Sequence, residues 1–303
     1  MLLDLPNFIL KYRNLVENKE IAALFHLMDD PDEVVYHSVS DKIISFGKEI
    51  IPNLENLWEN TLQETIQERI EQIIHKLHFR DLTNDFITWK NSDCELLQGA
   101  LLVARYQYPE MQETQVLKKI EKIRRNIWLE LNNYLTPLEQ ANVITSILYN
   151  YYQQKGIEVS YSQPDDFLIN TTLENQRGNS ISNGILYLIL CQLLDISVNA
   201  TNIPKQFILG YFDPQHEFIQ PVGHSAEKIF FFIDPLNGNI HSHKDIEKYF
   251  NRISISPSSA FFRPLSNKRI IRFLLEELSK CFNNESNLYK KEELLSIVKL
   301  LDE

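Results

Sequence analysis

Thiols and imidazoles are the side chains of this sequence whose types could do chemistry. Its three cysteines, Cys94, Cys191 and Cys281, lie far apart, and no CxxC pair occurs. Neither a zinc site nor a disulfide framework is therefore predicted, and unpaired thiols fit a reducing compartment. Cys191 falls in an apolar run, so we interpret it as a core residue. The other two have no visible acid–base partner and are interpreted as packing residues.

The stretch from His241 to Asp245, His-Ser-His-Lys-Asp, has two interpretations. On a strand, His241, His243 and Asp245 would share one face and could hold a metal. On a helix, Ser242 and Asp245 have the spacing of a capping box, and apolar residues follow at helical intervals. We favour the cap, so no metal site and no cofactor are predicted.

Composition narrows the choice of partner. The 303 residues include 41 acidic and 30 basic side chains, a net charge of −11, which disfavours nucleic acid. Only 8 residues are glycine, which disfavours a glycine-rich phosphate loop. A basic stretch spans residues 118–125 with Glu121 interleaved. We interpret it as a solvated helix face, the alternative being a patch for an acidic partner.

The sequence favours a cytoplasmic protein. Its start carries an early acid, Asp4, and no basic segment, so a secretory signal is not predicted. A membrane span needs about 20 apolar residues. The densest apolar run, residues 185–194, is much shorter. A membrane partner is therefore not expected.

The N-terminal third has helical periodicity throughout. A helix is predicted to start at Asp30, with Glu33 completing a capping box, and to end at Gly47. The Asp-Asp-Pro-Asp-Glu start and a Gly-x-x-x-x-Pro turn resemble a HEAT-type repeat; an ordinary helical subdomain is the alternative. The pattern breaks over 82–93, so a helical domain is predicted at residues 1–82 and a second domain at residues 95–303.

In the second region, further helices precede one that is apolar on nearly every side over residues 185–194, as expected of a buried central helix. Ser180 or Ser182 is expected to cap it. Apolar spacing near the C-terminus predicts two closing helices. The predicted class is α+β: a helical N-terminal region, then a domain whose central helix packs on a small antiparallel sheet. Its strands are expected at 197–200, 207–212, 218–221 and 228–233.

Five motifs, in this order and at this rough spacing, resemble the transglutaminase-like (papain-like) superfamily, and most closely its SirB-type bacterial branch. They are Tyr106-Gln-Tyr-Pro-Glu, Arg177-Gly-Asn-Ser-Ile-Ser, Ile203-Pro-Lys-Gln-Phe, Phe232-Ile-Asp-Pro-Leu-Asn-Gly and Ile271-Arg-Phe-Leu-Leu-Glu-Glu-Leu. The resemblance extends from about residue 95 to residue 303, and it depends on the ordered set of motifs because no single one is decisive.

The resemblance implies a Cys–His–Asp triad, whose positions fall on Ser180, Gln206 and Asp234. Only the orienting acid is retained. An amide is not basic near neutral pH, and a serine hydroxyl without an adjacent base is a poor nucleophile. We therefore expect a catalytically degenerate member, more a pseudoenzyme than an enzyme.

Three further residues could contribute to the site. Arg177 and Asn179 flank Ser180 and could orient a ligand carbonyl or carboxylate, or only hydrogen-bond to strand ends. His224 could replace the lost imidazole or could be a turn residue.

Three functions remain open at this point. The first is an interaction or scaffolding protein that binds a protein or peptide. The second is an active hydrolase or acyltransferase with a rearranged Ser/Cys–His–Asp site. The third is a structural helical adaptor in which the cleft has closed.

Overall fold

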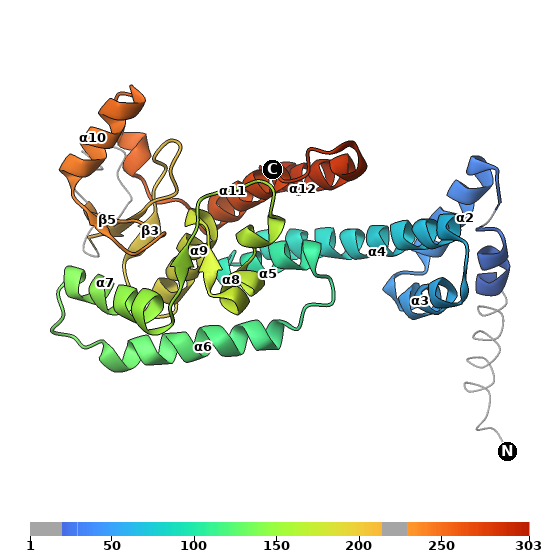
Figure 1. Cartoon of the computed structure of the whole chain (residues 1–303), viewed down its shortest axis with the longest axis horizontal. Coiled ribbons are helices and arrows are strands. Elements are labelled where there is room, and N and C mark those ends of the chain that lie inside the picture. The colour runs from blue at the N-terminus through green and yellow to red at the C-terminus, as the bar shows by residue number, and fades with distance from the viewer. Residues whose placement is uncertain (1–19, 29, 214–228, 303) are drawn as a thin grey trace, which may run out of the picture. The chain divides into compact units, whose positions relative to one another are not determined.

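The structure is a computed structural model of the chain, and it describes residues 20–28, 30–213 and 229–302. The chain forms two compact units, Met1–Asn84 and Asp85–Glu303, which we describe separately (Figure 1).

The described part of the first unit is helical. A helix at residues 20–26 is followed by α2 (Glu33–Ser45), a 3-10 turn (Lys48–Ile50), α3 (Ile51–Asn60) and the start of α4 (Glu64–Lys90). The predicted start of α2 is wrong by two residues. Asp32 caps the helix by accepting a hydrogen bond from Val34 N (2.9 Å), whereas Asp30 accepts from Asp32 N (2.8 Å). Gly47 follows the helix with φ +81°, a left-handed conformation that suits glycine.

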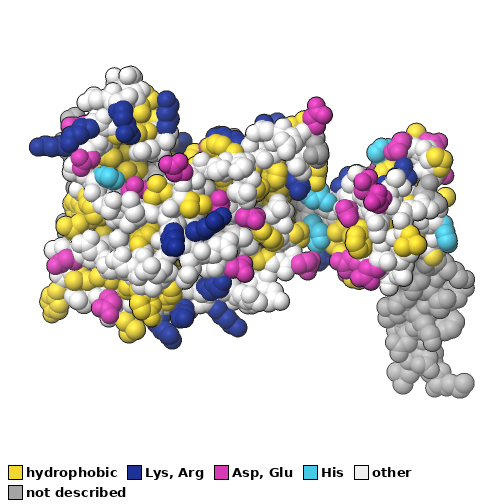
Figure 2. All heavy atoms as spheres, in the orientation of Figure 1, with side chains coloured by type: hydrophobic (Ala, Val, Ile, Leu, Met, Phe, Trp, Pro, Cys, Tyr) yellow, Lys and Arg dark blue, Asp and Glu magenta, His cyan; other side chains and the backbone are white. Residues whose placement is uncertain are grey.

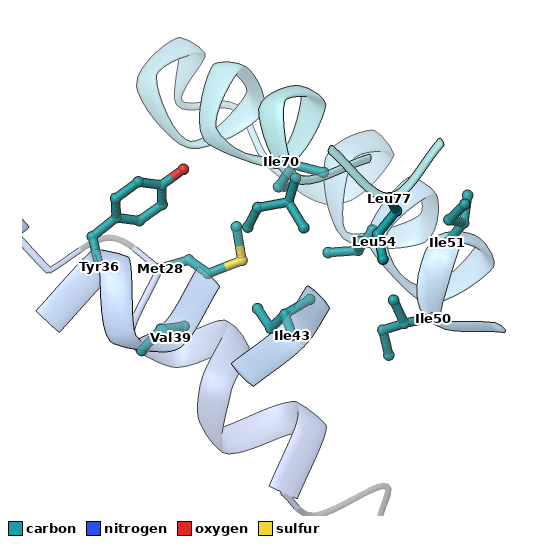
Figure 3. Close-up of a cluster of buried hydrophobic side chains, with 10 residues drawn as sticks. Met28, Tyr36, Val39, Ile43, Ile50, Ile51, Leu54, Ile70 and Leu77 are labelled. Atoms are coloured by element: carbon teal, nitrogen blue, oxygen red, sulfur yellow. The ribbon is translucent and has the colours of Figure 1, made fainter. Parts of the chain in front are cut away.

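Apolar faces of these helices meet in one core (Figure 3). Its buried members are Met28, Tyr36, Val39, Ile43, Ile50, Ile51, Leu54, Ile70, Ile73 and Leu77. Arg69 on α4 closes this core at one edge, because its guanidinium donates to Met28 O (2.8 Å) and Asp30 O (2.9 Å) and lies over the Tyr36 ring. The arrangement buries the apolar stripes that the sequence predicted.

The helical break predicted at residues 82–93 is wrong. Helix α4 continues without interruption to Lys90, and the two units divide within it, between Asn84 and Asp85. Leu82, Phe86 and Trp89 are all buried, and their spacing of four and three residues is itself helical. The apolar spacing of a helix therefore continues through residues 82–90, and Leu82, Phe86 and Trp89 are the residues that form it.

The second unit begins with the end of α4 and is mainly helical. Its helices are α5 (Leu96–Gln107), α6 (Glu113–Glu130), α7 (Pro137–Thr145), α8 (Ile169–Asn175), α9 (Ser180–Gln192), α10 (His243–Ile253), α11 (Asn267–Ser279) and α12 (Leu288–Asp302). A π-helix, η2 (Ser146–Tyr151), continues directly from α7. Every residue of α9 from Ile181 to Cys191 is buried, so the predicted central helix is confirmed. The two predicted closing helices are α11 and α12.

Four short strands form an antiparallel sheet in the order β3-β4-β5-β6. They are β3 (Val198–Ala200), β4 (Leu209–Phe212), β5 (Ile229–Ile233) and β6 (Ile240–His241). Helix α9 packs against β3, and the α+β prediction is confirmed. The strand predicted at 218–221 lies outside the described residues. A parallel pair that was not predicted, β1 (Lys155–Gly156) and β2 (Arg177–Gly178), precedes α9.

None of the helices in the described ranges is both long enough and apolar enough to cross a membrane.

Candidate functional site

The sequence predicted that Ser180 or Ser182 caps helix α9. That prediction is wrong, because the cap is Asn179. The Asn179 Oδ1 accepts hydrogen bonds from Ile181 N (2.9 Å) and Ser182 N (3.0 Å). The Ser182 hydroxyl instead donates to Asp166 O (2.8 Å). These contacts leave Ser180 as the first helical residue, where the positive end of the helix dipole lies.

Ser180, Gln206 and Asp234 line one cavity of about 950 Å³. They come from three different elements, because Gln206 lies in the turn before β4 and Asp234 directly follows β5. The Asp234 carboxylate accepts a hydrogen bond from Leu236 N (2.9 Å), which orders the turn after β5. The structure therefore brings the three triad-equivalent positions to one cavity, and their catalytic equivalence stays a prediction.

Among the described residues, no hydrogen bond of the kind that activates a nucleophile is present in the cavity. Within the described ranges, the Ser180 hydroxyl has no hydrogen-bond partner, and Gln206 is exposed to solvent. The neutral amide of Gln206 cannot accept a proton from the serine. Ser180 and Asp234 are both partly exposed, so water and a ligand can reach them.

One imidazole, that of His241 on β6, lines the same cavity. The sequence indicated His241 only as a candidate metal ligand. Strand β6 has two residues, too few for an alternating pattern that could have shown which way His241 faces. Its neighbour His243 is held elsewhere, with Nε2 within 2.6 Å of Ile229 O.

The cap interpretation of residues 241–245 is the one that the structure shows. Ser242 precedes α10 and donates from its backbone N (2.9 Å) and its hydroxyl (2.7 Å) to the Asp245 carboxylate. The hydroxyl hydrogen bond is the main cause that lowers the pKa of Asp245 to about 2. Among the described residues, no cluster of His, Cys, Asp and Glu side chains could hold a metal ion.

Arg177 and Asn179 make contacts within the fold. Arg177 forms an ion pair with Asp166 (3.1 Å), and Asn179 is fully buried at the cap. Neither side chain is among those that line the cavity. His224 lies outside the described residues.

Burial raises the pKa of two of the three thiols. Cys191 is fully buried, as predicted, and burial raises its pKa. Burial, with the carboxylates of Asp166 and Glu277 as smaller causes, raises the pKa of Cys281 to about 12. Cys94 has a left-handed backbone with φ +50°, and its sulfur lies near backbone carbonyl oxygens. The surroundings of Cys191 and Cys281 therefore disfavour a reactive thiolate.

Comparison with known proteins shows which family the chain belongs to. Residues 114–276 match the family model of the transglutaminase-like superfamily. The chain belongs to the transglutaminase-like superfamily. The match spans α6 to α11 and includes Ser180, Gln206 and Asp234.

Curated relatives carry only a family designation. The chain is 23% identical to UPF0162 protein YchA of Escherichia coli (strain K12) over 208 residues, which cover 67% of this chain and 71% of that protein. A UPF0162 protein of Xylella fastidiosa (strain Temecula1) is 26% identical over 132 residues, 42% of this chain and 46% of its own length. A third, from Buchnera aphidicola, is 21% identical over 199 residues, 64% of this chain and 68% of that protein. No solved structure matches the chain significantly.

Proposed function

We propose that this protein is a catalytically degenerate transglutaminase-like protein that uses its cavity to bind a protein or peptide segment. The observation that supports the proposal is that Gln206 lines the cavity. The resemblance to the family implies a histidine, the general base, at this position, and this chain has an amide there. Without a base, Ser180 cannot be deprotonated for attack, and no imidazole of the described residues is hydrogen-bonded to the Asp234 carboxylate.

The lining of the cavity suits a peptide. It combines aromatic surface from Phe207, Tyr249 and Phe273 with charged side chains and with the polar Ser180 and Gln206. Apolar walls with a few polar groups are typical of sites that bind small organic groups or side chains. A volume of about 950 Å³ accommodates several residues of an extended segment. An open cavity at Asp234 also disfavours the structural adaptor with a closed cleft.

A rearranged hydrolase is the second candidate, and the observation that favours it is His241 in the same cavity as Ser180 and Asp234. In the present geometry no described imidazole is hydrogen-bonded to Ser180. This candidate therefore requires a movement of β6 or of Ser180 when substrate binds.

Rebuilding the triad tests the assignment of the site. In the variant Ser180→Cys/Gln206→His, the thiol at the helix start should acquire a lowered pKa and react with iodoacetamide near pH 6, faster than Cys94, Cys191 or Cys281. The matched control is Ser180→Cys alone, which has the same thiol without the imidazole. Equal labelling rates in the single and double variants would show that positions 180 and 206 are not paired.

Activity of the parent protein separates the two candidates. We expect no turnover of ester or amide substrates. Turnover that is lost in both Ser180→Ala and His241→Asn would overturn the degenerate assignment in favour of the rearranged hydrolase.

A photo-crosslinker tests the predicted partner. With p-benzoylphenylalanine at position 206, irradiation of living cells should produce an adduct with another protein. The same amino acid at position 62, where Leu62 is almost fully exposed, is the control. Adducts of the same proteins from both positions would contradict binding at the cavity.

The proposal extends to three finer assignments. The first is membership of the SirB-type branch. The second is a HEAT-like arrangement of the N-terminal domain, supported by the succession of α2, α3 and α4 with a glycine turn at Gly47, with domains at residues 1–82 and 95–303. The third is a cytoplasmic location, which cell fractionation tests.

A further inference from the structure

Large apolar side chains are exposed where α6 ends and along α7 and η2. Leu129 is 65% exposed, Tyr151 71% and Tyr134 95%, and Trp128 and Leu138 are also exposed. Figure 2 shows hydrophobic side chains gathered over this part of the second unit, with Lys and Arg side chains of α6 beside them. Single exposed apolar residues are ordinary, but a contiguous set marks an interaction site.

Four apolar side chains from α6, α7 and η2 line one groove. Leu129 of α6 lines a hollow of about 610 Å³ together with Val143, Ile147 and Tyr151. Its polar lining consists of Asn126, Asn142, Ser146 and one acid, Glu130. We call this hollow the α6–η2 groove. None of its lining residues lines the cavity that contains Ser180, so the two sites are separate.

One wall of the α6–η2 groove is a π-helix. The bond from Tyr152 N to Ile147 O (2.9 Å) has the five-residue spacing of a π-turn, and Asn126 donates to the Tyr152 hydroxyl (2.9 Å), which ties this wall to α6. Ile147 and Tyr151 are four residues apart and both line the groove. Short π-helical turns are rare and often occur at functional sites.

A row of cations leads to the groove. Lys118, Lys122 and Arg125 lie on α6 at positions i, i+4 and i+7, and Leu129 continues the row at i+11. All three cations are exposed, and none is in an ion pair with a residue that the structure describes. The acid within this stretch, Glu121, is engaged by Arg124 through two hydrogen bonds of 2.7 Å. The Glu121 carboxylate also interacts electrostatically with Arg125, so the row carries an excess of positive charge that is partly compensated.

We propose that the α6–η2 groove binds an amphipathic, acidic helical segment of another protein. Apolar side chains of that segment would fill the groove at Leu129, Ile147 and Tyr151, and its carboxylates would lie along the cation row. This combination of apolar anchors and charge complementarity is the usual way in which a helix docks in a groove.

A second copy of this chain is a poorer occupant. A two-fold interface would use the same surface on both subunits. It would bring two cation rows into one interface, and like charges in contact disfavour association.

A peptide selection tests the proposal. A displayed library of random peptides of about 16 residues, roughly 24 Å long as helices, is selected on the full-length protein and counter-selected on Leu129→Asp. We expect enriched peptides to combine Asp or Glu with apolar residues at helical spacing. Their Kd should rise at least about tenfold in Leu129→Asp and in Lys122→Glu/Arg125→Glu, and should rise with salt.

Two matched controls keep the test specific. Leu62→Asp changes an exposed leucine and Lys155→Glu an exposed lysine that is outside the row; neither should change the Kd. Because all the substituted side chains are exposed, far-UV circular dichroism should be unchanged.

Three outcomes would overturn the proposal. They are selection of basic or neutral peptides, no enrichment beyond the counter-selected variant, and dimerisation by light scattering that Leu129→Asp abolishes, which would identify a second copy as the occupant. Because the groove and the cavity share no residue, each of these leaves the labelling and crosslinking tests of the cavity unaffected.

Discussion

Replacing Asn179 by alanine should destabilise the second unit by about 2–3 kcal/mol. The side chain is fully buried, and its Oδ1 accepts from Ile181 N and Ser182 N at 2.9 and 3.0 Å. Loss of an N-cap costs about 0.5–2 kcal/mol. A buried N–H left without a partner costs about 1–3 kcal/mol. Because the N–H groups at this cap are buried, we expect a loss at or above the upper end of the range for an N-cap.

The effect should be measurable by thermal unfolding and by hydrogen exchange. For a unit of this size, 1 kcal/mol corresponds to roughly 2–4 °C, so the Tm should fall by roughly 4–12 °C. Amide exchange of Ile181 and Ser182 should accelerate more than that of the helix centre, because their N–H groups lose their acceptor.

Two control variants separate capping from a general effect of substitution. Asn179→Ser retains a good cap acceptor and should lose about 1 kcal/mol or less. Ser180→Ala changes the next residue, whose hydroxyl has no hydrogen bond within the described ranges, and should stay within about 0.5 kcal/mol of the parent. The reasoning would be refuted if Asn179→Ala were as stable as Ser180→Ala. Asn179 would then not be the cap that holds the start of α9.

Three other predictions follow from packing and protonation. Leu186→Ala in the fully buried α9 should cost about 2–5 kcal/mol in urea unfolding, and an unchanged midpoint would show that α9 is peripheral. Gly156→Ala would bring a Cβ into a clash with Leu236 O, so it should lower the Tm and shift the NMR signals of the turn that carries Asp234; unchanged signals would contradict the close approach. The pKa of Asp245 is lowered to about 2 from 3.8, so its stabilising contribution is present above about pH 4 and is lost as the pH falls through 2. The Tm difference between the parent and Asp245→Asn should therefore shrink over that interval, and a constant difference would contradict the assignment.

The sequence by itself determined the elements whose signals are local. The capping-box spacing of Ser242 and Asp245 predicted the start of α10. The all-round apolar character of residues 185–194 predicted a central helix, because a helix without a polar face has to be covered on every side. Periodicity and caps depend on residues only a few positions apart, so the sequence alone is enough to predict them.

Other features depended on the tertiary structure. The cap of α9 is Asn179 because its side chain has both Ile181 N and Ser182 N within reach, whereas the hydroxyl of Ser182 is drawn to the carbonyl of Asp166, sixteen residues earlier. Three residues of suitable type within four positions cannot be ranked as caps without such a distant partner.

The environment of the candidate site was also decided by the tertiary structure. The resemblance to a family indicated Ser180, Gln206 and Asp234, but the sequence had no signal that His241 lines the same cavity. Strands of two to five residues carry too little periodicity to show which way a side chain faces. The pairing of Phe232 with His241 and of Ile233 with Ile240 fixes how β6 lies beside β5, and a two-residue strand has no alternation from which this register could be predicted.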